Sequence, residues 1–559
     1  QCSGSGVPLH RTRRPIVILQ HSYRSASKCS RVSALPSRST TIGFMRIDHI
    51  TLKNYRCFAN LRLDFHPQMT VLVAPNGQGK TTVLDAVKVA LWPYVAGFDM
   101  GSTTNDITGI HIDDVRREQV RSLEMDWRLP ASIYAKGFIR VEQLIEEGKQ
   151  WPGPRDWPEP DIVRPWEVHR TREKVKKGTK TRDHFTMGSY DPRDVGNGLT
   201  IVSSFETALK GFAESLQRRI FSEQPAVPDD LPMLGFYGTG RLWAQKKLTT
   251  AHEESNPEAQ SRTFAYRDCL DPASSYKHFA IWFTRAFRSL RDAQIQRIEK
   301  GQSLTTDIAS GLTASIRTIQ QAIDTLLRPH TGWHTLEYSA EYDELVLNHD
   351  VQGKLKVSQL SDGIRNMLAM VGDIAYRCYK LNAHHGADAA KQTHGIVMID
   401  EVDMHLHPSW QQTVLNDLSV AFPKLQFIVT THSPQVLTSV DASCIRKLVL
   451  ATDAETDQTL ITVEPVTTQT RGVASADVLA DIMYVNPIPD VPEARQLSQY
   501  HGFIQQGLHN TEEGLRLRVA LEAHFSPNHP VMHECDRLIR LEAFKRKLPL
   551  MKKPGVEGA

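Results

Sequence analysis

Apolar and polar positions alternate along residues 45–65, and this period of two predicts a pair of β-strands that share one buried face. The tripeptide at 54–56 interrupts the alternation, so we expect the turn between the two strands there. A mostly apolar run at 69–74 predicts a third strand, which is buried. Apolar residues then recur at helical spacing from Thr82, which predicts a helix directly after the third strand.

Further along the chain, apolar runs around 395–399 and 425–430 predict two more buried strands. Helical spacing predicts helices over 286–328, after residue 361, and through most of the tail that follows Arg471. A stretch rich in tryptophan and proline, 151–166, predicts an irregular surface loop. These elements indicate an α/β fold.

Composition divides the chain further. Residues 1–44 contain seven lysines and arginines and no acidic residue, which is typical of a targeting segment or of non-native leader sequence. We expect a leader without a fold and a natural start at Met45. The remaining chain is mildly acidic although the formal charge is +3, so charge alone does not indicate nucleic-acid binding. We expect a leader at 1–44, a head at 45–470 with an insertion at about 129–231 and a helical segment at about 270–330, and a C-terminal helical region at 471–559.

Two further features bear on location. The seven cysteines are scattered and form no C-x-x-C pair, which favours a reducing cytoplasm over a disulfide framework or a cysteine-based zinc site. No run approaches the roughly 18 apolar residues of a membrane-spanning helix. We therefore expect a cytoplasmic protein that has no membrane-spanning segment of its own.

A glycine loop lies between the third predicted strand and its helix. Gly77 and Gly79 would turn backbone N–H groups toward phosphate oxygens, and Lys80 would reach the β- and γ-phosphates of ATP. Thr81 would supply a hydroxyl to Mg²⁺. The other expected nucleotide contacts in this loop are Asn76, Gln78 and Thr82. The loop departs from the usual phosphate-binding pattern at Ala74, where a glycine is common.

A serine motif, "LSDGIRNML", opens the predicted helix after residue 360. Ser361 and Gly363 at a helix start could bind a γ-phosphate through the hydroxyl, the backbone amides and the helix dipole. Ser361 could equally be an ordinary N-cap residue. The two interpretations are compatible.

The predicted strand at 395–399 ends in two acids. Asp400 would hold Mg²⁺, and Glu401 would orient and polarise the attacking water, although acids in this position also cap helices. His432 follows the strand at 425–430 and could contact the γ-phosphate. His405 and His407, with His432, would allow a zinc site, but no third ligand lies at close spacing to the first two.

Taken in order, these four motifs resemble the ABC-type ATPases that include the heads of SMC, Rad50 and RecF proteins. The resemblance implies an ABC/SMC-type P-loop head in which the serine motif of one subunit completes the site of its partner. Lys80, Thr81, Asp400, Glu401 and His432 would then act in cis. Ser361 and Gly363 would act in trans, in a homodimer.

A closer resemblance rests on "NYRCF", "YGTGRLW", "DEVDMHLHPSWQ" and "GVASADVLADIMYVNPIP". These segments look like the PtuA ATPase of Septu and retron-Septu antiphage systems. The resemblance implies a separate HNH nuclease as partner and, in retrons, a reverse transcriptase with its RNA-linked DNA. Arg241 in the second segment would lie near the nucleotide, or else would be an exposed arginine beside a glycine-rich turn. The basic run 169–182 and the helical tail leave nucleic-acid contact and partner docking open.

Three functions fit these observations. The first is an ATPase that senses infection and regulates a partner nuclease; the second is a DNA-repair ATPase of the RecF or Rad50 kind. The third is an ATP-bound assembly module that does not hydrolyse its nucleotide. A transporter subunit fits poorly because of "LSDGIR" and the large insertions, and the tail has no acid or histidine spacing typical of a nuclease.

Overall fold

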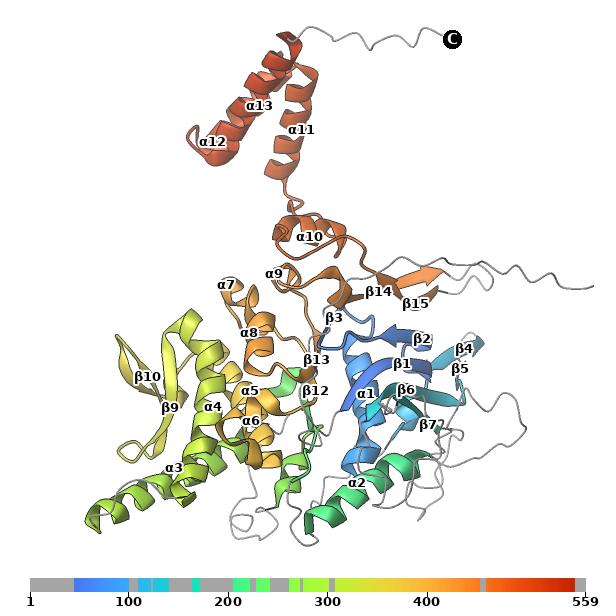
Figure 1. Ribbon diagram of the computed structural model, residues 1–559. Helices are drawn as coiled ribbons and strands as arrows, with labels where there is room; N and C mark the ends of the chain where they lie inside the picture. The colour runs from blue at the N-terminus through green and yellow to red at the C-terminus, as the bar shows by residue number, and fades with distance from the viewer. Residues whose placement is uncertain are drawn as a thin grey trace, which may run out of the picture. The chain divides into compact units, whose positions relative to one another are not determined.

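A computed structural model describes residues 45–99, 109–121, 124–139, 163–170, 205–221, 228–241, 261–271, 275–300, 307–452 and 459–547. A six-stranded sheet in the order β15-β14-β3-β13-β12-β8 forms its centre (Figure 1). The neighbours β8, β12, β13, β3 and β14 run parallel, and β15 runs antiparallel to β14. The strands are β3 (Met69–Val73), β8 (Met233–Tyr237), β12 (Gly395–Ile399), β13 (Leu425–Thr430), β14 (Ile445–Thr452) and β15 (Thr459–Pro465).

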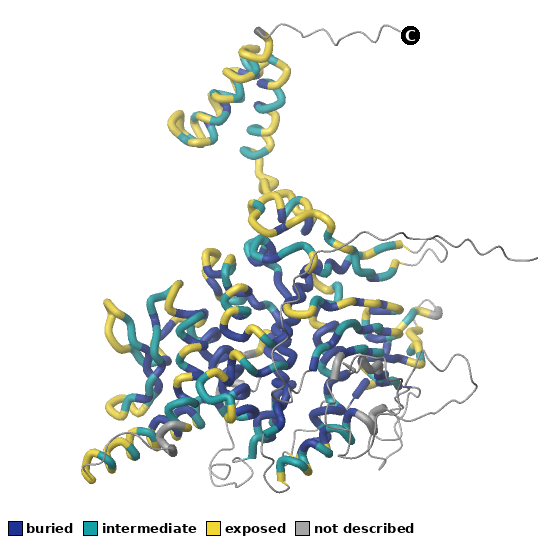
Figure 2. The backbone as a smooth tube through the Cα atoms, in the orientation of Figure 1, coloured by how far each residue is buried: buried dark blue, intermediate teal, exposed yellow. Residues whose placement is uncertain are grey.

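The middle of this sheet is the most deeply buried part of the described chain. Every residue of β3, β12 and β13 is buried, as expected for parallel strands covered on both faces (Figure 2). Because these three strands are neighbours and run parallel, the segments that follow them open on the same edge of the sheet. The strands predicted at 69–74, 395–399 and 425–430 are confirmed.

A second, antiparallel sheet in the order β2-β1-β6-β7 adjoins the helix α1 (Lys80–Val95). Its strands are β1 (Met45–Tyr55), β2 (Phe58–Asp64), β6 (Ala131–Ile139) and β7 (Val163–Arg170). Trp166 of β7 is 1% exposed and donates from Nε1 to the Ala90 carbonyl of α1 over 2.9 Å. The loop predicted for 151–166 is therefore wrong at its end, because an antiparallel edge strand tolerates Pro165 and buries the tryptophan. Residues 151–162 and 171–182 lie outside the described chain.

The helical segment predicted at 270–330 contains two long helices, α3 (Ser275–Glu299) and α4 (Asp307–Thr331). Both contact α5 (Asp362–Leu381), whose buried face joins the main hydrophobic core. The remaining helices before residue 440 are α2 (Phe205–Phe221), α6 (Ala389–Gln392), α7 (Pro408–Gln411), α8 (Val414–Ala421) and α9 (Pro434–Leu437). Two small antiparallel sheets comprise β4 (Arg117–Arg121) with β5 (Glu124–Trp127), and β9 (Trp333–Ser339) with β10 (Glu344–His349) and β11 (Gly353–Lys356).

The tail is helical, as its pattern predicts. It comprises α10 (Ser475–Asp481), α11 (Pro492–Gln506), α12 (Glu512–Phe525) and α13 (Pro530–Lys547). The last three helices bury a small core of their own around Tyr500, Ile504, Leu521, Met532 and Cys535. Across the described residues, no helix combines the length and the apolar character needed to traverse a membrane.

Candidate nucleotide-binding site

The loop 74–79 joins β3 to α1 and depends on two glycines. Gly77 and Gly79 have φ of 80° and 88°, in the left-handed region that favours glycine. At Gly79 an added Cβ would lie 2.5 Å from a ring carbon of Phe58, whereas at Gly77 it would meet nothing within 4 Å. Gly77 is therefore required by backbone conformation, and Gly79 by conformation and space. Such a turn ahead of a helix exposes N–H groups to an anion.

Lys80, the first residue of α1, folds back over this loop. Its Nζ donates to the carbonyls of Ala74 over 2.8 Å and Pro75 over 3.3 Å. Burial lowers the pKa of Lys80, and the nearby Asp400 and Glu401 carboxylates act in the opposite direction. Ala74 does not adopt a positive φ, so this position does not need the usual glycine. A phosphate oxygen could replace the two neutral carbonyls as the partner of the ammonium.

Asp400 lies at the end of β12 and binds two threonine hydroxyls from other elements. Its Oδ2 accepts from Thr81 Oγ1 over 2.9 Å, and its Oδ1 accepts from Thr430 Oγ1 over 2.6 Å. The carboxylate is buried, at 4% exposure. A buried carboxylate beside a hydroxyl at a glycine loop is the donor set that Mg²⁺ takes next to a phosphate. The residues present therefore fit that ion.

Glu401 follows Asp400 and adopts a φ of 49°, which is uncommon for a residue other than glycine. Its backbone N–H donates to Thr430 Oγ1 over 2.7 Å, which fixes this conformation. Its side chain is only half-buried, and its charge reaches Lys80. An observed backbone outlier held by its neighbours is frequent at functional sites.

His432 follows β13, the strand between β3 and β12. The residues on either side of it are fixed: Thr431 donates to Asp403 over 2.6 Å, and Ser433 caps α9. The His432 side chain is half-buried and makes no hydrogen bond to a described residue. The structure therefore brings Lys80, Asp400, Glu401 and His432 to one edge of the sheet.

The start of α5 is built differently. Ser361 occupies the N-cap position, but its side chain makes no capping hydrogen bond and the residue is exposed. At Gly363 an added Cβ would lie 2.4 Å from the carbonyl oxygen of His405, so glycine lets α5 pack against the segment after Glu401. The principal contacts of α5 are with α3, α4 and the 3-10 turn Arg262–Tyr266, and they do not include α1.

Comparison with known proteins agrees with this geometry. A family model described as an AAA domain matches residues 49–327, and a second AAA-domain model, of the AbiEii toxin type, matches residues 250–438. The chain is 26% identical to the "Retron Ec83 probable ATPase" of Escherichia coli, over 90% of this chain and 88% of the relative. It is 27% identical to the "Septu protein PtuA" of Bacillus thuringiensis, over 37% of this chain and 47% of the relative.

The chain is a PtuA-like ATPase of the retron and Septu type. It is also similar to the SMC head domain from Thermotoga maritima, at 14% identity and a TM-score of 0.35, over 76% of this chain and 100% of that chain. The parallel sheet and its glycine loop, rather than this similarity, give the chain the fold of the ABC/SMC-type heads.

The other predicted contacts of this PtuA-like ATPase lie close to the loop or at the limit of the described chain. Asn76 is exposed, Gln78 is half-buried, and the Thr82 hydroxyl interacts with the Cys57 thiol. Arg241 ends a short 3-10 turn, Thr239–Arg241, that follows β8. Asp400 N–H donates to the Tyr237 carbonyl over 2.8 Å, which places the end of β8 beside the acids. The Arg241 side chain lies outside the described residues.

The sequence patterns did not predict one buried polar network of this PtuA-like ATPase. Asp373 on α5 accepts from Arg377 Nε over 2.7 Å and from the Tyr237 hydroxyl over 2.8 Å, and the three residues are buried. The network ties α5 to β8 beside Asp400. Its signal in the sequence was an acid and a base four positions apart on an otherwise apolar helix face.

The structure does not support a zinc site made of His405, His407 and His432, because they form no group with metal-ligand spacing. Among the described residues, the group with metal-ligand spacing is Asp230, His384 and His385. None of the three earlier histidines belongs to it. This cluster lies at the other end of the sheet, before β8.

Proposed function

We propose that this chain binds and hydrolyses ATP in a dimer with two shared sites, and that the dimer regulates a partner nuclease in antiphage defence. One observation carries the proposal. The glycine loop, Lys80 and Asp400 converge at one sheet edge. Ser361, the N-cap residue of α5, is exposed, and its side chain makes no capping hydrogen bond. The first group would form one half of a phosphate site, and the exposed start of α5 would form the other half.

In the cis half, Lys80 would bind the β- and γ-phosphates in place of the Ala74 and Pro75 carbonyls. Thr81 and Asp400 would hold Mg²⁺, which when bound neutralises charge on the phosphate oxygens. Glu401 would accept a proton from the attacking water and orient it, and His432 would donate to the γ-phosphate. Asn76, Gln78 and Thr82 would line the loop around the nucleotide, and Arg241 would approach it from β8.

In the trans half, Ser361 and Gly363 of one copy would contact the γ-phosphate held by the other. A helix N-terminus carries a partial positive charge, and the uncapped N–H groups of α5 would find a partner in that phosphate. ATP would therefore join two copies, and loss of the γ-phosphate would release them. This coupling would let nucleotide state control an attached enzyme.

The partner proposed is an HNH nuclease, together with a reverse transcriptase and its RNA-linked DNA where the system is a retron. The kinship with proteins named for retron and Septu systems supports this choice. The tail offers a surface for docking, since several of its apolar side chains are more than half exposed, among them Ile488, Leu515, Val519 and Phe544. Such an assembly would work in the cytoplasm.

The first test uses Glu401→Gln, which keeps the size of the side chain and removes its charge. We expect ATP binding to persist, hydrolysis to fall roughly a hundredfold or more, and an ATP-dependent dimer to accumulate in gel filtration. Phosphate release and the elution volume are measured together. Hydrolysis at the wild-type rate would refute the role of Glu401.

The second test asks whether the two halves come from different copies. Lys80→Ala and Ser361→Arg should each be inactive alone, but a mixture of the two should recover activity, because one mixed site contains neither change. Ser358→Arg, at an exposed serine three positions earlier, is the matched control and should stay active. Failure of the mixture to recover activity, with both variants folded and exchanging subunits, would contradict a shared site.

A further inference from the structure

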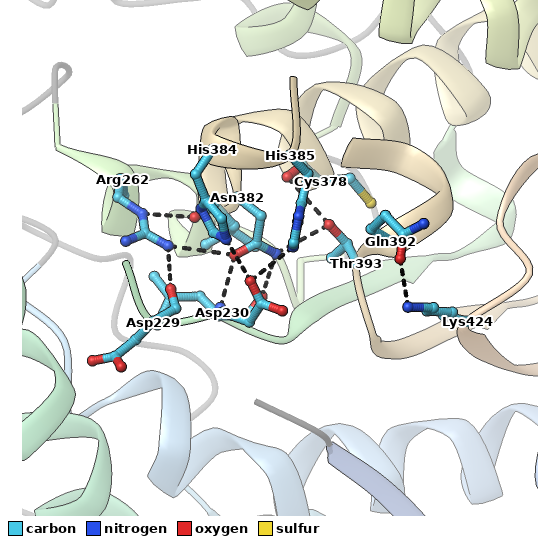
Figure 3. A network of polar contacts seen from close by, with 12 residues as sticks. Asp229, Asp230, Arg262, Cys378, Asn382, His384, His385, Gln392, Thr393 and Lys424 are labelled. Carbon is cyan, nitrogen blue, oxygen red and sulfur yellow. Dashed lines mark hydrogen bonds and ion pairs between the residues drawn. The ribbon is translucent and has the colours of Figure 1, made fainter. Parts of the chain in front are cut away.

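Two consecutive histidines meet one buried carboxylate at the amino end of β8. His384 Nε2 lies 2.6 Å from Asp230 Oδ1, and His385 Nε2 lies 2.8 Å from the same oxygen (Figure 3). The two rings are 4.2 Å apart between centroids. Asp230 is 8% exposed, and the described chain offers its carboxylate no partner except these imidazoles. Three ligand atoms from two distant segments of the chain thus converge on one point.

The backbone around this cluster is held firmly by Asn382, which is fully buried. Asn382 accepts from the Leu231 N–H over 2.8 Å and donates to the Leu231 carbonyl over 2.9 Å. These bonds fix the residue after Asp230 to the residue that precedes the turn Ala383–Asp388. Thr318 Oγ1 lies 3.1 Å from the carbonyl oxygens of Gly386 and Ala387 and 2.9 Å from that of Ala314, any one of which can accept its proton. The backbone next to the three side chains is therefore held by bonds that do not involve those side chains.

The cationic side chains near the cluster form their hydrogen bonds with other groups. Arg219 binds the carboxylate of Asp229 over 3.0 Å, and Arg262 donates to the carbonyls of Asp229 and Leu381 over 2.6 and 2.7 Å. Lys424 donates to Gln392 over 2.6 Å. Arg262 also interacts electrostatically with Asp230, but the hydrogen bonds of the Asp230 carboxylate go to the two imidazoles.

We propose that Asp230, His384 and His385 bind a divalent transition-metal ion of the Zn²⁺ class. Two imidazole nitrogens and one carboxylate form the ligand set that such ions prefer and that Mg²⁺ does not. With bonds of about 2.0 to 2.2 Å, a tetrahedral ion needs ligand atoms roughly 3.3 Å apart. Small side-chain rotations would open the present 2.6 and 2.8 Å contacts to that spacing. The fourth coordination position would be taken by water or by a group from a partner.

This site is separate from the nucleotide site. Asp230 precedes β8, whereas Lys80, Asp400 and Glu401 follow β3 and β12, which run parallel to one another and to β8 within the sheet. The two sites therefore lie at opposite ends of the central sheet. An ion bound to Asp230, His384 and His385 would link the segment before β8 to the turn after α5. Ser361 is the N-cap residue at the other end of α5.

The test uses the full-length protein, stripped with a chelator and titrated with Zn²⁺ in excess Mg²⁺ and ADP, which keep the nucleotide site occupied. We expect one tightly held Zn²⁺ per chain by elemental analysis. His384→Gln and Asp230→Asn should each lower the affinity at least about tenfold, since outer-sphere changes alone reach that size. His278→Asn is the matched control, because His278 pairs with Asp268 at 3.5 Å without a second histidine, and it should not change Zn²⁺ binding.

Folding of each variant is checked by its affinity for Mg-ATP. The wild-type protein is also loaded with Co²⁺, which should give visible absorption bands of a four- or five-coordinate nitrogen and oxygen site that Zn²⁺ then removes. This second measurement does not depend on any variant. Wild-type protein that holds no Zn²⁺ and gives no such bands would overturn the proposal. So would folded variants that bind Zn²⁺ with wild-type affinity.

Discussion

The two ends of the central sheet carry two groups of ionisable side chains that are assembled in opposite ways. At the carboxyl ends of β3 and β12, the glycine loop with the start of α1 (74–82) and the pair Asp400 and Glu401 are each one short, continuous segment. At the amino end of β8, Asp230 meets two histidines that lie 154 and 155 positions away in the chain. The first group is recognised from local sequence, and the second exists only after folding.

The partners of the two groups differ as well. Lys80 is bonded to backbone carbonyls that a phosphate can replace, and Glu401 holds a positive φ beside it. Asp230 is instead already surrounded by imidazoles. The comparison teaches that the geometry of the nucleotide site depends largely on local backbone conformation. The geometry of the histidine cluster depends on contacts between segments far apart in the chain. If so, changes at one end should leave the other end intact.

The largest effect is expected for Lys80→Ala. Removal of the ammonium takes away the charge that would stabilise the phosphates, so hydrolysis should fall roughly a hundredfold or more. Zn²⁺ affinity at the opposite end should not change. Steady-state phosphate release and Zn²⁺ titration of the same preparation measure both. A parallel loss of Zn²⁺ binding would show that the two ends are not independent.

Asn382→Ala should act mainly on stability and on the histidine cluster. It leaves the buried N–H and carbonyl of Leu231 without their partners, at a loss of about 2–4 kcal/mol in the free energy of unfolding. Chemical denaturation measures this loss, with Thr393→Val as a milder control that removes one bond to Asn382. Zn²⁺ affinity should fall and Mg-ATP affinity should be retained. Equal losses at both sites would mean that Asn382 supports the sheet as a whole.

Gly79→Ala should impair nucleotide binding more than Gly77→Ala does. Both positions have positive φ, but only at Gly79 would the new methyl group clash, with Phe58 and with Cys57 Sγ at 2.7 Å. The conformational strain alone is worth about 1–3 kcal/mol, so both variants should bind ATP more weakly. Calorimetric titration ranks them. Equal affinities would mean that the Phe58 ring moves aside freely.

The smallest effect is expected at Lys380, near the end of α5. Burial lowers its pKa to about 8 from the ordinary 10.5, so the folded protein holds this proton less tightly than the unfolded chain. The lysine therefore destabilises the fold below pH 8, and stability rises with pH between 8 and 10.5 as this penalty disappears. Lys380→Met should raise the unfolding midpoint by roughly 1–3 °C at pH 7.

The gain from Lys380→Met should shrink as the pH approaches 10, because folded wild-type Lys380 is then neutral and the pH nears the pKa of 10.5 in the unfolded chain. Lys391→Met, at an exposed lysine, is the control and should change little. Thermal unfolding of the three proteins at two pH values measures the difference. A gain that does not depend on pH would assign the effect to packing rather than to charge.

The sequence by itself determined the buried strands β3, β12 and β13, the glycine loop, and the order of the four ATPase motifs. It did so because each depends on residues that are neighbours in the chain: an apolar run, a glycine pair, or two adjacent acids. The helices of the tail were readable for the same reason. The end of the tryptophan-rich stretch was not, since Val163–Arg170 becomes a strand only by pairing with β6.

Tertiary structure alone decided which distant groups meet. The Thr430 hydroxyl that binds Asp400, the pairing of Tyr237 with Asp373, and the closure of His384 and His385 on Asp230 join segments far apart in the chain. Such contacts are set by strand order and by the packing of α5 on the sheet. No local period or spacing encodes them, because a hydrogen bond or a metal-ligand set depends on distance in space.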